Sequence, residues 1–246
     1  MEEAASKAIK DSEILSALLE GITSKKDEIR FNSYHILLNI SEHNPAILSP
    51  KWDYLADLLT SHNQYSRYVA INLLANLVKV DTEKKFEACF DRYFDIITGK
   101  KTMVAGQATL NAGKIAKAKP NLQTKITNTL LKVDRIHRGR QTELMKAYAI
   151  EALNDYVDEI ADKEKIIDFV KAQLASDSPK TRKAAKVFLE CNRTRRVKAL
   201  QTPWQGISFF VNKYGSKPNI GGGLLVCRYE STLLIVFPPV PLLPRL

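Results

Sequence analysis

Residues 27–40 read DEIRFNSYHILLNI, and the pattern in this stretch decides the fold class. Arg30 is followed by a small residue three positions later, a bulky apolar residue four after that, and another apolar residue three further on. These offsets place the four side chains on one face of an α-helix. The small residue would let a neighbouring helix approach closely, and the larger apolar residues would fill the groove between the two helices.

The same pattern recurs along the chain at near-constant spacing. Its copies are Arg30-Ser33-Leu37-Ile40, Arg67-Ala70-Leu74-Leu77, Ala105-Ala108-Ala112-Ile115, Lys146-Ala149-Leu153-Tyr156 and Arg182-Ala185-Leu189, with Asn192 in the last apolar place. The third copy is degenerate because it lacks the basic residue. The steps between copies are 37, 38, 41 and 36 residues. Such a period is typical of helical-repeat proteins, whose hairpins stack because one hairpin cannot bury its own apolar face.

Each of the first four repeat helices is followed by a second amphipathic segment. These second segments span about 51–61, 85–99, 120–132 and 162–175, and residues 11–22 look like an earlier member whose first helix would be missing. We therefore predict an all-α fold: an α-solenoid of about five helical hairpins over residues 11–200. Residues 1–10 are polar and charged, and we expect them to be a flexible N-terminus.

The stretches DEIRFNSYHILLNI and DSPKTRKAAKVFLE resemble the first helix of HEAT repeats. In that family an acidic residue precedes Val or Ile with Arg or Lys, then a small residue, then Leu. The best matches are Asp27-Ile29-Arg30 and Asp177-Arg182-Ala185. The resemblance covers about residues 11–200 and implies the HEAT-like architecture. HEAT-like proteins are mostly scaffolds and adaptors, and a minority bind nucleic acid.

The composition changes abruptly in residues 201–246, which hold five of the ten glycines and six of the ten prolines. Breakers this dense exclude a further helical repeat. The runs ISFFVNKY, GLLVCRY and STLLIVF are instead typical of strands separated by turns. Three interpretations stay open for this tail: a small β-hairpin or meander that caps the solenoid, a poorly ordered appendage, and a non-native extension.

The sequence contains no recognisable catalytic constellation. The histidines His35, His43, His62 and His137 are scattered without a helical metal spacing, and no phosphate-binding glycine loop or nucleophile elbow occurs. The cysteines Cys89, Cys191 and Cys227 form no CxxC pair, so we expect reduced thiols in a cytoplasmic protein. No uncharged apolar stretch reaches about 18 residues, so no membrane insertion is expected. We predict no enzyme activity, no metal and no cofactor.

The charge of the chain is unevenly distributed. Residues 1–99 hold 11 basic and 15 acidic residues, whereas residues 100–146 hold 11 basic and 2 acidic residues. Cations near helix C-termini are favoured by the helix dipole, which explains part of this excess without a partner. The rest predicts a site for nucleic acid or another polyanion. Its candidate residues are Lys114, Lys117, Lys125, Lys132, Arg135, Arg138 and Arg140.

The repeat without a catalytic set predicts a scaffold or adaptor that binds a protein partner on a concave surface lined by the second helices. Nucleic-acid binding through the basic region is the alternative. The chain also resembles the HEAT-like DNA glycosylases in length, basicity and architecture, and that resemblance implies tryptophans and an aspartate in a basic groove. Only Trp52, followed by Asp53, and Trp204 are present, so the catalytic residues of that family are not matched.

Overall fold

The computed structural model describes residues 2–160, 163–201, 225–229 and 232–236. The chain divides into two compact units, Met1–Leu200 and Gln201–Leu246.

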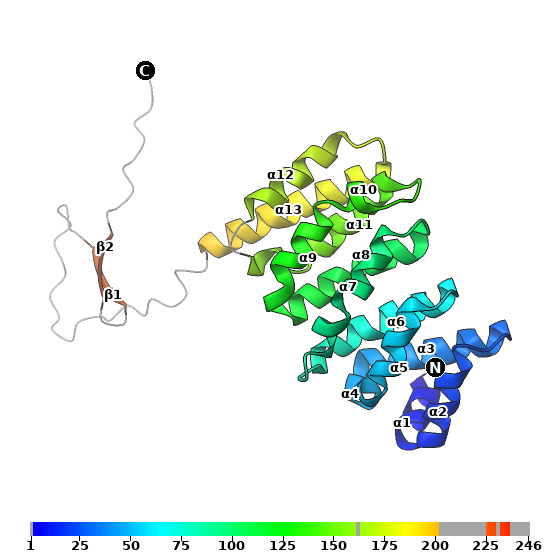
Figure 1. The fold of residues 1–246 in the computed structure, drawn as a ribbon. Coiled ribbons are helices and arrows are strands. Elements are labelled where there is room, and N and C mark those ends of the chain that lie inside the picture. Colours follow the sequence, from blue (N-terminus) through cyan, green and yellow to red (C-terminus); the bar gives the residue numbers. More distant parts are fainter. Residues whose placement is uncertain (1, 161–162, 202–224, 230–231, 237–246) are drawn as a thin grey trace, which may run out of the picture. The chain divides into compact units, whose positions relative to one another are not determined.

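The helical unit is a stack of hairpins, each of which begins with a first helix that carries one copy of the repeat (Figure 1). The first helices are α3 (Asp27–His43), α6 (Gln64–Leu77), α8 (Thr102–Ala118), α11 (Thr142–Asn154) and α13 (Pro179–Gln201). Among the repeat residues only Tyr156 falls beyond the end of its helix. The predicted all-α solenoid of about five hairpins is therefore confirmed.

Second helices follow the first four of these and precede α3. They are α2 (Ser12–Gly21), α4 (Pro45–Leu48) with α5 (Trp52–Asp57), α7 (Lys85–Thr98), α9 (Gln123–Leu130) with α10 (Val133–Ile136), and α12 (Glu164–Ala172). Short 3-10 turns join, extend or follow the helices of both layers: η1 (Ser49–Lys51), η2 (Leu58–Thr60), η3 (Val78–Val80), η4 (Pro120–Leu122), η5 (Val157–Glu159) and η6 (Gln173–Ala175). Pro45, Pro50 and Pro120 stand in first turns, where no backbone donor is needed.

Residues 2–10, which we expected to be flexible, form helix α1 (Glu2–Lys10). Ala5 and Ala8 are buried and lie one helical turn apart, and α1 packs on α2 and α3. Helix α1 is thus the partner that the segment 11–22 was expected to lack. Two alanines offer too little apolar area to reveal this face within a charged segment.

The repeat positions form the core of the stack. The bulky apolar members Leu37, Ile40, Leu74, Leu77, Ile115 and Leu153 are fully buried. Leu189 is only half-buried, because in the described residues no further repeat helix packs on α13. The repeat in the sequence therefore marks residues that are buried between successive hairpins, as expected for a one-dimensional core.

The degenerate third copy produces a close contact between two first helices, α8 and α11. A Cβ placed on Gly113 would lie 2.6 Å from the backbone oxygen of Ala152, and one on Gly106 would lie 2.5 Å from the ring of Tyr148. Only glycine allows the backbones to approach this far. The small residues of this copy thus match the close approach of the neighbouring helix.

The basic residue of the repeat has a structural role in the turn before its helix. Arg30, Arg67 and Arg182 each donate to the carbonyl oxygen of the serine six residues earlier, over 3.0, 2.6 and 2.6 Å. The hydroxyl of each serine in turn accepts the backbone N–H two residues on, at 3.1, 3.1 and 3.2 Å. The serines are Ser24, Ser61 and Ser176. One turn design therefore repeats at three of the five hairpin starts.

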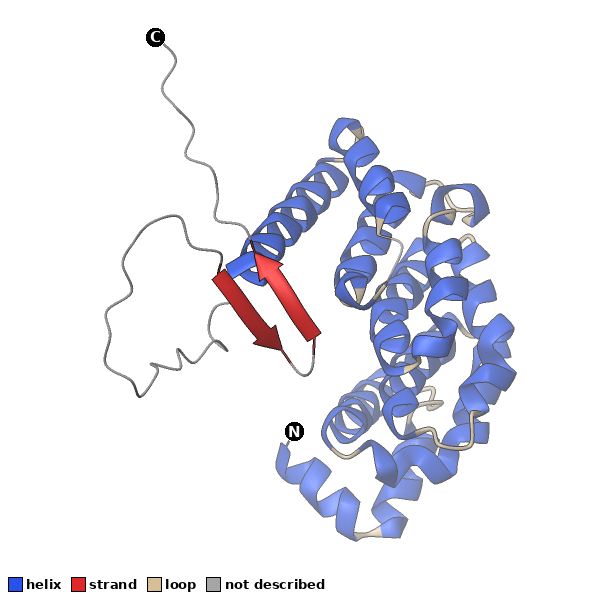
Figure 2. Ribbon diagram, turned by 90° about the vertical axis from the view of Figure 1, so that its left-hand side faces the viewer, coloured by secondary structure: helices blue, strands red, loops and turns tan. Residues whose placement is uncertain are grey.

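The first helices form the more closely spaced layer of the solenoid. Helix α3 packs directly on α6, α6 on α8, and α8 on α11. The second helices meet their neighbours in the stack mainly through short segments, such as η2 and α10 on α7. A stack bends toward its closer layer, so this spacing favours the first helices for the inner side of the curve that the helical unit shows in Figure 2. The prediction that second helices line the concave surface is thus disfavoured by the spacing of the first helices, which the small repeat residues draw together.

The second unit contains one described hairpin. Strands β1 (Leu225–Tyr229) and β2 (Thr232–Val236) pair antiparallel, with Leu225 opposite Val236 and Tyr229 opposite Thr232. Two of the three predicted strand runs therefore form strands. The run ISFFVNKY lies outside the described residues, and capping of the solenoid by the tail stays a prediction.

Candidate interaction surfaces of the helical unit

The seven predicted polyanion-binding cations lie in separate places. Lys114 and Lys117 stand near the C-terminal end of α8, Lys125 on α9, and Lys132, Arg135, Arg138 and Arg140 in or beside α10 and the link to α11. All seven are exposed. The link packs beside the N-terminus of α8, and this 17-residue helix is about 25 Å long. The candidates therefore do not form one continuous basic track.

Lys114 and Lys117 lie in a shallow groove on the first helices and have polar neighbours. The ammonium of Lys114 donates to the side-chain oxygen of Asn76 over 3.3 Å, and Lys79 lines the same groove. Burial raises the pKa of the Asp155 carboxyl, although Lys117 and Lys114 favour its ionised form. This pair of lysines therefore partly serves to compensate the charge of the Asp155 carboxylate.

Two further lysines of the basic region hold the second helices in place. Lys125 pairs with Asp91 over 2.8 Å and lies 4.0 Å from the ring centroid of Phe90. Lys119 is buried and pairs with Asp81 at 2.8 Å and with Glu87 at 3.3 Å. These lysines link α9 and the end of α8 to α7 and the turn before it, so part of the charge excess is structural.

His137 holds the link before α11 against the turn between α7 and α8. Its buried ring places Nδ1 3.0 Å from the carbonyl oxygen of Ile97 and Nε2 3.4 Å from the hydroxyl of Thr102. Since a carbonyl only accepts, Nδ1 carries the proton in this arrangement. The backbone N–H of Arg138 donates to the oxygen of Thr98 over 3.1 Å. These bonds fix the backbone from which Arg138 projects.

A basic cavity lies beside this anchored link, with a volume of about 360 Å³. Its charged lining residues are Arg67, Arg92, Lys100, Lys101, Arg138 and Asp95. The sequence indicated only Arg138, because Arg67 belongs to the repeat and Arg92 to the acidic half of the chain. Packing of the α6–α7 hairpin against the turns before α8 and α11 brings these cations together. The one sequence feature that could have indicated the cavity was the Lys100-Lys101 pair between two predicted helices.

The exposed face of the first helices, which we call the first-helix face, carries apolar side chains on most members of the stack. Phe31 of α3, Met103 of α8 and Val187 of α13 are 56%, 70% and 47% exposed. Half-buried Tyr68 and Tyr148 lie between them in sequence, and the Lys180 ammonium stands 3.9 Å from the Tyr148 ring centroid. In each helix these residues lie on the side opposite the buried repeat positions. They therefore share one exposed side of the layer.

Buried asparagines tie the first helices together beneath this face. Asn76 donates to the hydroxyl of Ser41 over 2.9 Å, and Asn111 donates to the side-chain oxygen of Asn72 over 3.1 Å. Each bond joins one hairpin to the next. Paired polar groups of this kind fix the relative position of neighbouring helices, so the first-helix face is a rigid support.

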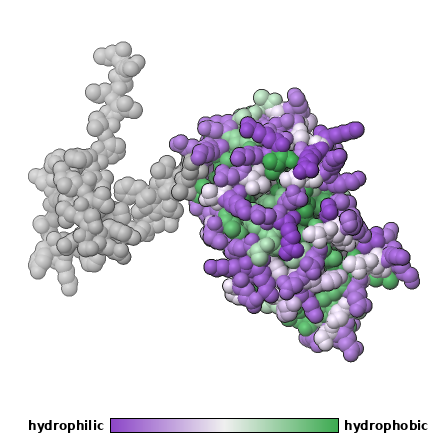
Figure 3. Space-filling view, in the orientation of Figure 1, coloured by the Kyte–Doolittle hydropathy of each residue, from purple (hydrophilic) through white to green (hydrophobic). Residues whose placement is uncertain are grey.

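The surface seen in the orientation of Figure 1 is largely hydrophilic. The view in Figure 3 shows mainly polar and charged side chains with smaller apolar areas between them.

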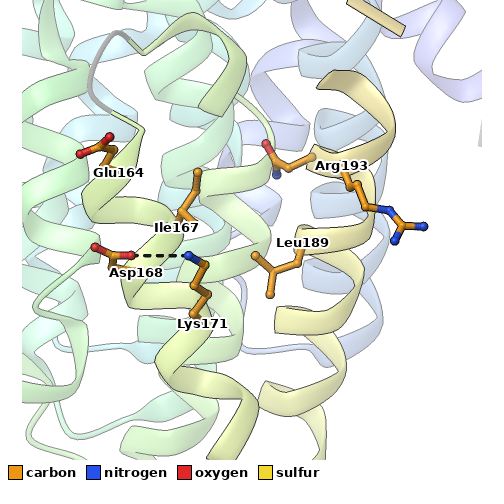
Figure 4. Close-up of a pocket in the computed structure, with 7 residues that line it drawn as sticks. Glu164, Ile167, Asp168, Lys171, Leu189 and Arg193 are labelled. Carbon is orange, nitrogen blue, oxygen red and sulfur yellow. Dashed lines mark ion pairs between the residues drawn. The ribbon is translucent and has the colours of Figure 1, made fainter. Parts of the chain in front are cut away.

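An open groove of about 500 Å³ lies between α12 and α13, where Ile167 and Leu189 stand beside the Asp168–Lys171 ion pair of 3.9 Å (Figure 4). Its half-buried Leu189 occupies a repeat position that is buried elsewhere. The groove thus has the composition of a repeat interface without its next hairpin.

Trp52, one of the two tryptophans considered in the resemblance to HEAT-like DNA glycosylases, does not line a groove. Trp52 is buried and packs edge-on against Phe86, with ring centroids 6.5 Å apart, so it is a core residue. Trp204 lies outside the described part of the chain. No group of three or more histidine, cysteine or acidic side chains in that part could hold a metal ion. Nor does any described helix combine the length and apolarity needed to cross a bilayer.

Known proteins resemble this chain in fold and not in sequence. No protein-family model and no curated protein matches the sequence. A designed armadillo repeat protein superposes with a TM-score of 0.50 at 15% identity, covering 76% of this chain and 84% of that chain. The helical unit has a HEAT/armadillo-like repeat fold. An engineered protein of the Northeast Structural Genomics Consortium is also similar, with a TM-score of 0.47 at 18% identity over 78% of this chain and 88% of that one.

Proposed function

We propose that this HEAT/armadillo-like solenoid is a non-enzymatic scaffold that binds an extended segment of a protein partner along the first-helix face. The observation that carries the proposal is the exposure of Phe31, Met103 and Val187 on three first helices of one rigid layer. Exposed large apolar side chains gathered on one face are typical of interaction sites. Protein partners suit such a face because apolar and aromatic anchors dominate binding energy in protein interfaces.

The partner is expected to be extended because the candidate contacts follow the long axis of the stack. They lie one per hairpin from α3 to α13, counting half-buried Tyr68 and Tyr148 with Phe31, Met103 and Val187. An extended chain presents side chains at regular intervals and so can meet successive hairpins. The unpaired thiols Cys89 and Cys191 suit a reducing compartment such as the cytoplasm.

The test is retention of partners by purified full-length protein and by two triple variants. The face variant carries Phe31→Glu, Met103→Glu and Val187→Glu. The control variant carries Ile14→Glu, Tyr54→Glu and Leu174→Glu, which changes exposed apolar residues of the second layer. We expect at least one partner whose affinity, remeasured with purified components, falls by about tenfold or more only in the face variant. Equal binding by all three proteins would contradict the proposal, as would substrate turnover by the purified protein.

Nucleic-acid binding is a second candidate, favoured by one observation. Lys132, Arg135, Arg138 and Arg140 are exposed, and none of them has an ion pair within the described residues. Cations in this state can neutralise phosphates and release counterions. Titration of a DNA duplex against salt separates this candidate from the first. Replacing all four side chains by glutamine should abolish binding at low salt, whereas unchanged binding would exclude these residues.

A further inference from the structure

The basic cavity beside the α7–α8 turn concentrates positive charge to a degree that the fold does not require. Five of its charged lining residues are cations and only Asp95 is acidic. Arg92 has a distant partner, Asp57, at 3.9 Å. Lys100, Lys101 and Arg138 have no ion pair with any described residue. Like charges gathered without counter-charges repel one another, so the cavity favours an anion.

The cations come from separate elements that other contacts hold in place. Arg67 uses its Nε–H on the carbonyl oxygen of Ser61, which leaves its terminal N–H groups for a ligand. Arg138 follows buried His137, whose ring is bonded to Ile97. Lys100 and Lys101 precede the first turn of α8, a helix end with no side-chain cap. The cavity is therefore largely formed before any ligand arrives, which reduces the ordering cost of binding.

The size and donors of the cavity suit one compact, doubly charged group. Guanidinium groups donate two parallel hydrogen bonds to phosphate oxygens, and the lysines add point charges. A nucleic-acid backbone would need further cations in line, but Lys114 and Lys117 stand toward the other end of the 17-residue helix α8. Met103, 70% exposed, lies in the first turn of α8 two residues after Lys101, so an apolar contact is available near the cavity.

We propose that this cavity binds the phosphate of a phosphorylated serine or threonine in the partner segment, so that phosphorylation of the partner controls its capture. This inference rests on the proposed scaffold function and names its regulation. The first-helix face supplies apolar contacts, and the cavity reads the charge. An aspartate or glutamate in place of the phosphorylated residue binds weakly, because it carries half the charge and fewer oxygens.

The experiment uses full-length protein and a fluorescent degenerate peptide library with phosphoserine fixed at its centre. Matched libraries carry serine or glutamate there. We expect the phosphoserine library to bind at least about tenfold more tightly than either. Inorganic phosphate should compete for this binding, whereas chloride at equal ionic strength should not. Equal binding of the three libraries would overturn the proposal.

Two variants with the same charge change locate the binding. The cavity variant carries Lys100→Gln, Lys101→Gln and Arg138→Gln, and the control carries Lys114→Gln, Lys117→Gln and Lys125→Gln. The cavity variant should lose about tenfold or more in phosphopeptide affinity and the control less than about twofold. Equal losses in the two variants would show diffuse charge attraction and overturn the proposal. Tighter binding to a DNA duplex than to the phosphopeptides, lost only in the cavity variant, would assign the cavity to nucleic acid instead.

Phosphatase treatment distinguishes failure of this inference from failure of the scaffold. Suppose that a purified partner binds equally before and after phosphatase treatment, but does not bind the Phe31/Met103/Val187 variant. This result would overturn only the phosphate site. A partner that is unaffected by that variant contradicts the proposed function. Loss of binding after phosphatase, reproduced by the cavity variant, supports the inference.

Discussion

Arg67 donates its Nε–H to the carbonyl oxygen of Ser61 over 2.6 Å, across the turn that starts the second of the five hairpins carrying the repeat. Arg30–Ser24 and Arg182–Ser176 repeat this contact in other hairpins. The arginine of the repeat thus satisfies a carbonyl that the turn leaves without a backbone partner. This explains why a charged residue recurs in a pattern otherwise defined by burial.

Replacing Arg30 by methionine should destabilise the helical unit by about 1–2 kcal/mol, because the oxygen of Ser24 loses its donor. The stacking of the guanidinium on Tyr65, 4.8 Å from the ring centroid, is lost as well. Urea denaturation followed by circular dichroism measures the change. Lys7→Met, at an exposed lysine, is the control, and equal effects of the two substitutions would contradict the turn role.

Gly113→Ala should destabilise the protein by about 1–3 kcal/mol, since the added methyl would lie 2.6 Å from the Ala152 oxygen. Helix propensity alone predicts the opposite sign, a gain of about 1 kcal/mol. The sign of the change in thermal unfolding therefore decides between the two effects. A stabilised variant would show that α8 and α11 are further apart than described.

Asp81 should stabilise the fold at neutral pH and lose this contribution in acid. Burial opposes its ionisation, but the hydrogen bond from Lys119 and the backbone N–H groups of Phe86 and Lys85 hold its pKa below the ordinary value. A lowered folded-state pKa means that the stabilisation is present above the unfolded pKa, near 4, and disappears as pH falls through the folded value.

Asp81→Asn should therefore cost about 2–4 kcal/mol at pH 7, because Lys119 keeps only Glu87 as a charged partner. The difference from the wild type should shrink as pH falls below about 4. Chemical denaturation at several pH values measures it, with exposed Asp91→Asn as the control. A difference independent of pH would exclude the ionised carboxylate as its source.

Cys89 should resist thiol reagents in the folded protein. Burial raises the pKa of its thiol to about 11, and the side chain is enclosed in the core. At pH 8 only roughly one thiol in a thousand would be ionised even if the reagent could reach it. Mass spectrometry of alkylated peptides should show modification of half-buried Cys191 before Cys89. Equal rates in native buffer would mean that α7 opens readily.

The fold was largely predictable because its core is one-dimensional. Residues such as Leu37 and Leu74 repeat at a fixed spacing, and each copy independently reports the same burial. Helix α1 was missed because a face made of Ala5 and Ala8 has little apolar signal. The close approach of α8 and α11 was not predictable, because helix spacing depends on contacts between hairpins at small residues such as Gly106 and Gly113.

The candidate sites were much less predictable. The sum of charges along the sequence identified the region of Arg138. It gave buried Lys119 the same weight as exposed cations, although Asp81 and Glu87 already compensate the charge of Lys119. Arg67 and Arg92 join Arg138 only because hairpins distant in sequence are stacked. The exposure of Met103 likewise follows from its place in the first turn of α8 and has no signature in composition.

Site-specific photocrosslinking tests the role of the first-helix face most directly. A photoreactive phenylalanine analogue is placed at Phe31, Tyr68, Met103 or Val187, and at Leu174 and Tyr54 of the second layer as controls. The scaffold proposal predicts that the four first-helix positions crosslink to one and the same partner while the two controls do not. Crosslinks to that partner only from Leu174 or Tyr54 would contradict it.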